Sequence, residues 1–404
     1  MSTFYVYNNT YVGKCYWTEK RSRINGVFSY DDDYLSGKEN WTIDPALSLV
    51  IGAQPSKNGL PGAFRDASPD RWGQTLIRHR YRKEYKDKSK QTRRLNDVDY
   101  LMGVSDFSRQ GDLRFSLEKD GVFEHPSDNI PQLTALPKLL YAAHNYEAEN
   151  EENAITFLLN AGSASLGGAR PKAAVIDGED LFIAKFPHKQ DKWDVMAWEW
   201  VCLNIAAEAG IDVPENRLVL IDGQNVLLVK RFDRAGIKRI GYISAMTMLG
   251  LSDGEHADYY EIAEKLRDIS ISVKDDLYEL YKRIILNILL NNTDDHLRNH
   301  GLVHSGSGWK LSPVFDINPT PDSTTLRVTS IFSELEKERA ITALKRNCQV
   351  FNISLNEADK VLSDVQNAIK KIEIYTKKAG IPKDECKMVL NAIGFTEPTC
   401  SKPQ

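Results

Sequence analysis

The order of segments in the middle of the chain constrains the fold more than any single motif does. Between residues 154 and 241, the sequence passes from a helix through a loop of small residues into two apolar strands, a second helix and a hairpin. The hairpin turns at Asp222-Gly223, a dipeptide that favours a tight turn between strands. In chain order, these segments are the loop 162–172, the strand 180–188, the helix 194–210 and the hairpin 216–234. This order predicts a compact α/β lobe.

The N-terminal flank of this region has a different pattern. Aromatic and β-branched residues alternate over the first fifty positions, which predicts a hairpin that turns at Asn8-Asn9 and a strand near 23–30. The period then changes to a helical one, where Ser68 is placed to cap a helix and Pro69 to occupy its first position.

Beyond Gly241 almost all signals are helical. Apolar residues recur at helical spacing over 275–290 and again over 358–372. The second stripe is preceded by the capping box SLNE at 354–357, and its helix is predicted to end at Gly380. The last third of the chain is therefore predicted to be helical.

Composition narrows the class of protein. Of 404 residues, 42% are hydrophobic and 27% charged, with a net charge of −4, which is typical of a globular protein. This near-neutral charge argues against independent binding to DNA or an anionic membrane, and the basic run at 78–94 is most simply a solvated helix face and loop. The five scattered cysteines contain no CxxC pair, and the N-terminus does not resemble a signal peptide. No apolar run reaches the roughly 18 residues of a membrane helix, so we expect a cytoplasmic protein.

The small-residue loop and the lysine after it are candidates for phosphate binding. Gly167 and Gly168 allow close approach of the backbone to a ligand, although the loop matches neither GxxxxGK[ST] nor GxGxxG. Lys185 lies in the otherwise apolar strand FIAKFP, and Glu199 on the next helix is placed to pair with it. Each feature also has a simpler interpretation: a tight turn for the loop, and an edge-strand lysine that reaches solvent. KRFDR at 230–234 is either a charged strand end or a segment whose backbone faces a nucleotide base.

The most informative stretch is NNTDDHLRNHG, which directly follows a long apolar helix. Asp294 and Asn299 stand five positions apart, which is the interval of the protein-kinase catalytic loop HRDxxxxN. Asp316 follows in LSPVFDINP, where a carboxylate could supply a second ligand to Mg²⁺. On residue types alone, three interpretations are open: a kinase-like loop, a transition-metal hydrolase centre built from Asp294, Asp295, His296 and His300, and a polar loop with a satisfied histidine.

Taken together, these motifs resemble those of the HipA family of bacterial toxin–antitoxin serine/threonine kinases. Five segments carry the resemblance, and they occur in family order with plausible spacing. They are SLGGARPKA (165–173), IAKFP (183–187), KRFDR (230–234), NTDDHLRNHG (292–301) and LSPVFDINP (311–319). The beginning of the chain also looks like the small β-rich subdomain of full-length members.

The resemblance implies a two-lobed, protein-kinase-like α+β fold with an α/β N-terminal lobe and an all-helical C-terminal lobe. We expect the β-rich subdomain at 1–125, the kinase N-lobe at 126–235 and the helical lobe with the catalytic loop at 236–404.

The resemblance also implies a role for each site residue. Asp294 would be the catalytic aspartate, His296 would lie beside it near the nucleotide, and Asn299 and Asp316 would hold Mg²⁺. The ATP contacts would come from the loop, the lysine strand with its acidic partner, and the backbone beside adenine: Ser165, Gly167, Gly168, Lys185, Glu199, Lys230 and Phe232. Ser165 matches the serine that family members autophosphorylate, which ejects the loop and silences the kinase, with Ser163 as the neighbouring candidate.

The expected function is therefore transfer of the γ-phosphoryl group of Mg·ATP to a serine or threonine of a host protein, with an aminoacyl-tRNA synthetase as the expected substrate. The resemblance further implies a small helix-turn-helix antitoxin (HipB-like) as partner, with DNA contacted only through that partner and no membrane involved. A metal-dependent hydrolase and a non-catalytic co-regulator of a DNA-binding antitoxin remain as alternatives.

Overall fold

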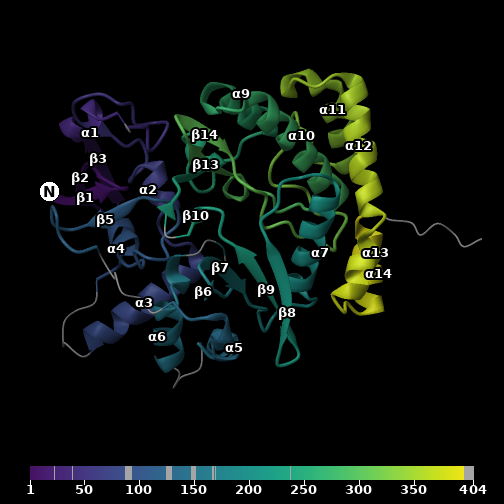
Figure 1. Cartoon of the computed structure of the whole chain (residues 1–404), viewed down its shortest axis with the longest axis horizontal. Coiled ribbons are helices and arrows are strands. Elements are labelled where there is room, and N and C mark those ends of the chain that lie inside the picture. Colours follow the sequence, from purple (N-terminus) through teal and green to yellow (C-terminus); the bar gives the residue numbers. More distant parts are fainter. Residues whose placement is uncertain are drawn as a thin grey trace, which may run out of the picture. The chain divides into compact units, whose positions relative to one another are not determined.

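The computed structural model describes residues 1–21, 23–38, 40–86, 93–123, 130–146, 152–165, 168, 170–236 and 238–394. The chain divides into two compact units, each built from segments that are distant in sequence. The first unit comprises Met1–Gln190, Pro214–Glu255 and Gly301–Ser312, and the second comprises Asp191–Val213, His256–His300 and Pro313–Gln404. Figure 1 shows the elements of both units coloured along the sequence.

An antiparallel five-stranded sheet forms the N-terminal part of the first unit. Its strand order is β4-β3-β2-β1-β5, with β1 (Ser2–Tyr7), β2 (Tyr11–Lys20), β3 (Arg23–Tyr30), β4 (Gln54–Pro55) and β5 (Arg114–Ser116). The predicted hairpin at Asn8-Asn9 is confirmed, since the Thr10 N–H donates to Asn8 Oδ1 across the turn at 2.9 Å. The rings of Phe4, Phe28 and Phe115 surround Phe64 of helix α2 (Gly62–Asp66) in edge-to-face contacts. One face of this sheet is therefore closed by aromatic packing.

A second antiparallel sheet has the order β6-β7-β9-β8. Its strands are β6 (Lys172–Asp177), β7 (Asp180–Lys185), β8 (Asn216–Ile221) and β9 (Gln224–Lys230). The predicted turn at Asp222-Gly223 is confirmed, with both residues at positive φ, as a tight hairpin turn of this kind requires. Buried Val175 and Phe182 share a core with Trp72, Leu139 and Leu158. These last three residues belong to helices α3 (Arg71–Lys86), α5 (Leu136–Asn145) and α6 (Glu152–Asn160).

The start of α3 differs from the prediction. The helix begins at Arg71 rather than at Pro69. The Ser68 hydroxyl donates to the Phe64 carbonyl at 2.8 Å, so it completes the end of α2 instead of capping α3. A serine between two helices can serve either of them, and here the preceding helix holds it.

The expectation of a helical chain beyond Gly241 is wrong for three short segments. Strands β12 (Tyr242–Ser244), β13 (Gly301–Ser305) and β14 (Gly308–Leu311) form a sheet in the order β12-β13-β14, within the first unit. These strands are short, and β12 pairs with β13 across a long intervening stretch of chain. A pairing so distant in sequence leaves no local periodicity to read.

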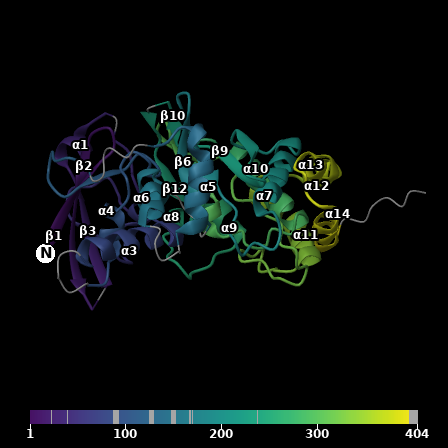
Figure 2. The same cartoon turned by 90° about the horizontal axis from the view of Figure 1, so that it is seen from below.

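In the second unit, all regular elements of the described residues are helices. They are α7 (Val195–Glu208), α9 (Tyr259–Ile269), α10 (Val273–Leu289), η3 (Leu297–Asn299), α11 (Lys337–Arg346), η4 (Cys348–Phe351), α12 (Leu355–Ile369), α13 (Ile372–Lys378) and α14 (Lys383–Ala392). Helix α10 packs against α9, α11 and α12, and Figures 1 and 2 both show α11 to α14 grouped together. The second unit is thus helical, as the predicted fold class requires, and it also contains α7.

The predicted C-terminal helix is divided in two. Its capping box is confirmed, because Ser354 Oγ accepts from the Glu357 N–H and Glu357 reaches back to the Ser354 N–H. The predicted stripe is buried along α12 except for the half-buried Leu362 and continues to Ile372, but a break at Lys370 and Lys371 separates α12 from α13. The remaining described elements are α1 (Asp32–Ser36), α4 (Asp97–Met102), η1 (Leu133–Ala135), η2 (Ser163–Ser165), β10 (Arg234–Ala235), β11 (Lys238–Arg239) and α8 (Ala245–Met248).

Candidate functional site

The candidate catalytic loop starts at the end of helix α10. Asn291 follows the helix at φ +53°, in the left-handed region that asparagine tolerates. The Asn291 N–H donates to the Ile288 carbonyl at 3.3 Å, and the Asn292 N–H donates to the Asn287 carbonyl at 2.9 Å. This pair of bonds is a Schellman motif, which satisfies the last carbonyls and turns the chain sharply away from the helix axis.

The two consecutive aspartates of the loop occupy opposite environments. Asp294 is exposed, whereas only 5% of Asp295 is accessible to solvent. Asn299, five positions after Asp294, is buried, and its side-chain amide donates to the Asp294 carbonyl at 3.3 Å. The short helix η3 therefore folds the predicted interval into a compact turn that brings Asn299 back to Asp294.

His296 lies inside this turn. Its N–H donates to the Asp294 carbonyl at 2.9 Å, and its own carbonyl accepts from the Asn299 N–H at 2.8 Å. The ring is partly buried, and its Nδ1 has no hydrogen-bond partner among the described residues. His296 is therefore a structural part of the turn through its backbone, and its ring holds a buried nitrogen without a hydrogen-bond partner among the described residues.

Asp295 is the centre of a buried network. Its Oδ2 accepts from the Tyr259 hydroxyl, from Asn287 Nδ2 at 2.7 Å and from His300 Nε2 at 2.9 Å. Burial alone would raise the pKa of Asp295, but the adjacent His300 and Tyr259 hold that pKa below its usual value. Buried Arg327 adds a positive charge nearby. The kinase-like interpretation assigned no role to Asp295, whereas the structure places its carboxylate in contact with three side chains.

Asp316 lies on a segment that is hydrogen-bonded to the same loop. The Thr320 N–H donates to the Asn291 carbonyl at 2.9 Å, and the hydroxyls of Thr320 and Thr293 are 2.7 Å apart. Asp316 itself is half-buried at φ +60°, a left-handed conformation that costs energy for a non-glycine residue. Backbone strain of this kind gathers at functional sites, which makes Asp316 a site candidate independently of its sequence motif.

In the first unit, the small-residue loop holds its candidate serine inside. Ser165 is buried, with its Oγ 2.7 Å from Ser108 Oγ and 2.6 Å from the Gly162 carbonyl oxygen. Ser163 is also buried, and its hydroxyl has no hydrogen-bond partner among the described residues. Gly167, a predicted phosphate contact, lies outside the described residues.

Gly168 shows why this loop needs glycine. Its φ is +96°, and a Cβ there would lie 2.4 Å from Lys172 Nζ. The Gly168 N–H donates to Asp70 Oδ2 at 2.5 Å, so a residue near the start of α3 fixes this part of the loop. The loop backbone therefore passes directly over a buried lysine head group.

Lys172 lies opposite Lys185, the lysine that the sequence predicts as a phosphate contact. Lys172 of β6 and Lys185 of β7 are directly opposite in the antiparallel ladder. Like charges in this position repel each other, so the pair favours an anion beside it. Sequence reasoning singled out Lys185 and missed Lys172, although the register of the two strands could have indicated it. Glu199 lies buried in α7, in the other unit, and its pairing with Lys185 stays a prediction.

KRFDR has a structural role that the sequence did not indicate. Arg231 and Asp233 are both buried and form an ion pair of 2.5 Å. Arg231 Nη1 also donates to the Ser108 carbonyl at 2.5 Å, and Asp233 Oδ2 accepts from the Gly111 N–H at 2.7 Å. The motif therefore fixes the loop at residues 108–111 to the end of β9.

The two predicted nucleotide contacts in this motif differ in their surroundings. The Lys230 side chain turns outward to Asp180 at 2.6 Å, and its N–H donates to the Glu215 carbonyl at 2.8 Å. The Phe232 ring is partly buried and lies 6.1 Å from that of Tyr242. A role for their backbone groups beside adenine stays a prediction.

Two features of the described residues bear on the metal-hydrolase alternative and on a membrane location. Among the described residues, no three His, Cys, Asp or Glu side chains are grouped so that they could hold a metal ion. Of the acids and histidines proposed for a hydrolase centre, Asp295 and His300 are bonded to each other, whereas Asp294 is exposed. None of the described helices is long and apolar enough to cross a membrane.

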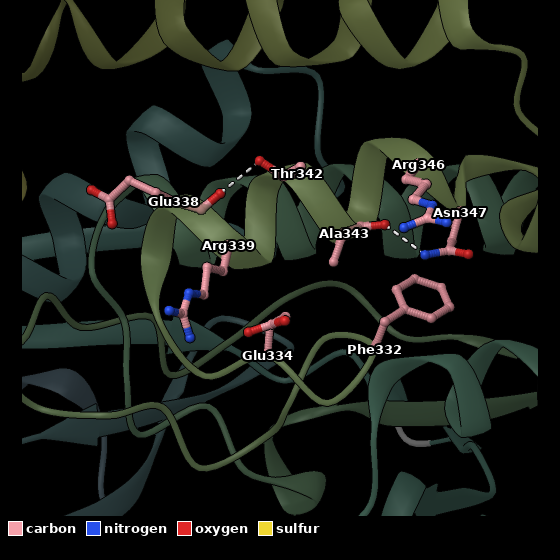
Figure 3. A pocket seen from close by; sticks show the side chains of 8 residues that line it. All are labelled: Phe332, Glu334, Glu338, Arg339, Thr342, Ala343, Arg346 and Asn347. Carbon is pink, nitrogen blue, oxygen red and sulfur yellow. Dashed lines mark hydrogen bonds between the residues drawn. The ribbon is translucent and has the colours of Figure 1, made fainter.

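An open groove of about 510 Å³ lies along helix α11 (Figure 3). Its lining mixes charged and polar side chains with one aromatic ring: Phe332, Glu334, Glu338, Arg339, Thr342, Ala343, Arg346 and Asn347. None of the predicted site residues lines this groove. The groove and the candidate catalytic loop therefore have no residue in common.

Comparison with known proteins gives the chain its context. The model of the HipA-like C-terminal domain matches residues 164–372, which is more than half of the chain. The chain is 25% identical over 228 residues to a Haemophilus influenzae protein named "Putative kinase", and 26% identical over 184 residues to the Sinorhizobium fredii protein named "Putative kinase Y4mE". These matches span 48% and 39% of this chain, and 66% and 42% of the two relatives' own lengths.

A solved structure matches over nearly the whole length. It is a chain from the Shewanella oneidensis MR-1 toxin–antitoxin complex of HipA, HipB and operator DNA. The two chains superpose with a TM-score of 0.66 at 14% identity, covering 97% of this chain and 95% of the other. This likeness confirms the predicted fold class, including the β-rich N-terminal part that the family model does not cover.

Proposed function

The chain belongs to the HipA-like C-terminal domain family, and from this premise we propose that it is a kinase that transfers the γ-phosphoryl group of Mg·ATP to a serine or threonine of a protein. The proposal extends to the role of toxin in a toxin–antitoxin pair. The names of the two relatives point in the same direction.

One observation carries the proposal most directly. The exposed Asp294 and the buried Asn299 are joined by a hydrogen bond within one compact turn, at the interval that phosphoryl transfer uses. Asp294 faces solvent, where a substrate hydroxyl could approach it and pass its proton to the carboxylate. His296 belongs to the same turn and would lie beside the nucleotide.

The donor set suits a hard divalent cation. Asn299 and Asp316 offer amide and carboxylate oxygens, which Mg²⁺ prefers, and Asp316 has the strained backbone that is typical of functional sites. Bound Mg²⁺ would neutralise charge on the transferring phosphate. The task of the chain is to hold these oxygens and the aspartate in place.

In the first unit, the paired lysines support a phosphate site. Lys172 and Lys185 oppose each other beside Gly168, whose backbone lies against the Lys172 head group. We propose that both lysines contact ATP phosphates, together with the backbone of the loop from Ser165 through Gly167 to Gly168. Glu199 would orient Lys185, and the backbone of Lys230 and Phe232 would face adenine.

The catalytic test is Asp294→Asn. This variant should lose phosphoryl transfer by at least about 10³-fold, because the proton acceptor is gone, and should keep its melting temperature because Asp294 is exposed. Transfer is measured with γ-labelled ATP. Asp322→Asn, another exposed carboxylate of the same unit, serves as control. Full activity in Asp294→Asn would remove this residue from the mechanism.

The partner and substrate are proposed as well. A small helix-turn-helix antitoxin is supported by the fold shared with the Shewanella chain, which was solved with HipB and operator DNA. We propose that DNA is reached through that partner, and that the substrate is a host protein such as an aminoacyl-tRNA synthetase. Phosphoproteomics of cells that express the chain, compared with cells that express Asp294→Asn, would identify the substrate.

A non-catalytic co-regulator would behave differently in two measurements. It would not require Asp294 or Asp316 for repression by its partner, and the wild-type chain would show no phosphoryl transfer. A metal-dependent hydrolase would be stabilised by Zn²⁺ or Mn²⁺ alone rather than by Mg·ATP in a melting assay.

A further inference from the structure

The interval between Asp294 and Asn299 recurs one residue later in the loop. Asp295 directly follows Asp294, and His300 directly follows Asn299, so this second pair is also five positions apart. Asp295 and His300 are both buried, and their side chains are joined at 2.9 Å. The buried pair of Asp295 and His300 therefore follows the proposed catalytic pair of Asp294 and Asn299 by one residue in the sequence.

Three further contacts fix the buried pair to its surroundings. The Tyr259 hydroxyl at the start of α9 and Asn287 Nδ2 near the end of α10 both donate to Asp295 Oδ2, the latter at 2.7 Å. The Asp295 carbonyl accepts from the Thr329 hydroxyl at 2.6 Å. The Asp295 carboxylate thus connects helices α9 and α10, and its bond to His300 joins the two ends of the catalytic turn.

The main chain on the other side of Asp294 is held too. The Thr293 carbonyl accepts from the Val328 N–H at 2.8 Å. Asp294 therefore lies between two anchored residues, although its own side chain faces solvent. An exposed catalytic group keeps its direction only if its backbone is fixed, and a misplacement of about 1 Å can lower a rate by about 10²-fold.

We propose that Asp295, Tyr259, Asn287 and His300 form a clamp that sets the position of Asp294 relative to Asn299. This inference rests on the proposed kinase function for its catalytic consequence. In the clamp, Asp295 is a positioning residue rather than a second catalytic acid, and His300 is its counterpart at the far end of the turn.

The test compares two substitutions of His300. In His300→Gln, the side-chain amide can still donate to Asp295, whereas His300→Leu has similar bulk and no donor. We expect His300→Leu to lower kcat by about 10- to 100-fold, with KM for ATP changed by less than about threefold. His300→Gln should restore kcat to within about threefold of the wild type.

Backbone hydrogen exchange supplies a readout that does not depend on activity. Exchange of the amides at 293–299 should accelerate in His300→Leu and return towards the wild-type rate in His300→Gln. Tyr259→Phe removes a single hydrogen bond from the clamp, and it should show a smaller change in the same direction. It also serves as the informative variant if His300→Leu does not fold.

The possible results separate the two proposals. If the wild type transfers no phosphate, the kinase function fails, and the clamp is judged on exchange alone. If kcat falls in His300→Leu or Tyr259→Phe while loop exchange is unchanged, the residue acts in the chemistry itself and the clamp is wrong. Unchanged kcat and unchanged exchange in both variants would also overturn it.

Discussion

At the scale of single residues, the hydroxyl of Ser165 is held away from solvent. It has two polar neighbours, Ser108 Oγ at 2.7 Å and the Gly162 carbonyl at 2.6 Å. Autophosphorylation of Ser165, which we propose from the family resemblance, requires this hydroxyl to leave both neighbours. The structure therefore describes a protected state of the serine, and Ser108 is the side chain that contributes to the protection.

Ser108→Ala should accelerate phosphorylation of Ser165. The lost hydrogen bond is worth about 1 kcal/mol, which corresponds to an increase of roughly fivefold in the released population and in the initial rate. Ser163→Ala is the matched control, because the Ser163 hydroxyl is buried without a hydrogen-bond partner among the described residues. Time courses followed by phosphopeptide mapping would measure the rate, and they would also reveal phosphate on Ser163 instead. An unchanged or slower rate in Ser108→Ala would contradict the prediction.

At the scale of elements, the sequence predicted local structure well where a local signal existed. The capping box at Ser354 and the turn at Asp222-Gly223 were both confirmed, because each depends on residues within a few positions. KRFDR was harder to interpret. Its Arg231 and Asp233 bind a loop that lies more than a hundred positions earlier in the chain, and no periodicity encodes such a contact. A charged segment at the end of a strand can therefore be either exposed to solvent or buried as an ion pair that holds two segments together. Only the fold distinguishes the two cases.

Asp233→Asn should destabilise the first unit strongly. The substitution leaves Arg231 buried without its countercharge, and breaking a buried ion pair in this way costs about 3–5 kcal/mol. The matched control is Asp177→Asn, which removes a carboxylate that also pairs with an arginine, but at an exposed site. That control should cost less than about 1 kcal/mol. Urea denaturation of both variants measures the difference, and equal midpoints would contradict a structural role for the motif.

At the scale of the whole molecule, the order of segments predicted the α/β lobe, and the family resemblance supplied the two-lobed fold class. The candidate site could be predicted only in part. The interval from Asp294 to Asn299 is local, so the sequence displayed it directly. The Lys172–Lys185 pair and the network around Asp295 depend on strand register and on helices that are distant in the chain. The same is true of the pairing of β12 with β13. Contacts of this kind arise from the assembled fold, which is why local patterns did not reveal them.

The pH dependence of folding is a property of the assembled molecule as well. Asp112 is buried near Arg234 and Arg239, and burial raises its pKa to about 7. A carboxyl group in the unfolded chain has a pKa near 4, so the folded state binds the proton more tightly. The stability that this group contributes is fully present below pH of about 4, and it is lost as the pH rises to about 7.

Asp112→Asn should remove this part of the pH dependence. The amide stays neutral, so the variant should gain stability relative to the wild type as the pH rises from about 4.5 to 7.5. The gain is at most about 4 kcal/mol, since each pKa unit corresponds to about 1.4 kcal/mol. The measurement is the free energy of unfolding in urea at several pH values, with the exposed Asp177→Asn as control for the other titrating groups. Curves for Asp112→Asn and the wild type that stay parallel over this range would show that Asp112 is ionised in the folded protein at low pH, held so by Arg234 and Arg239.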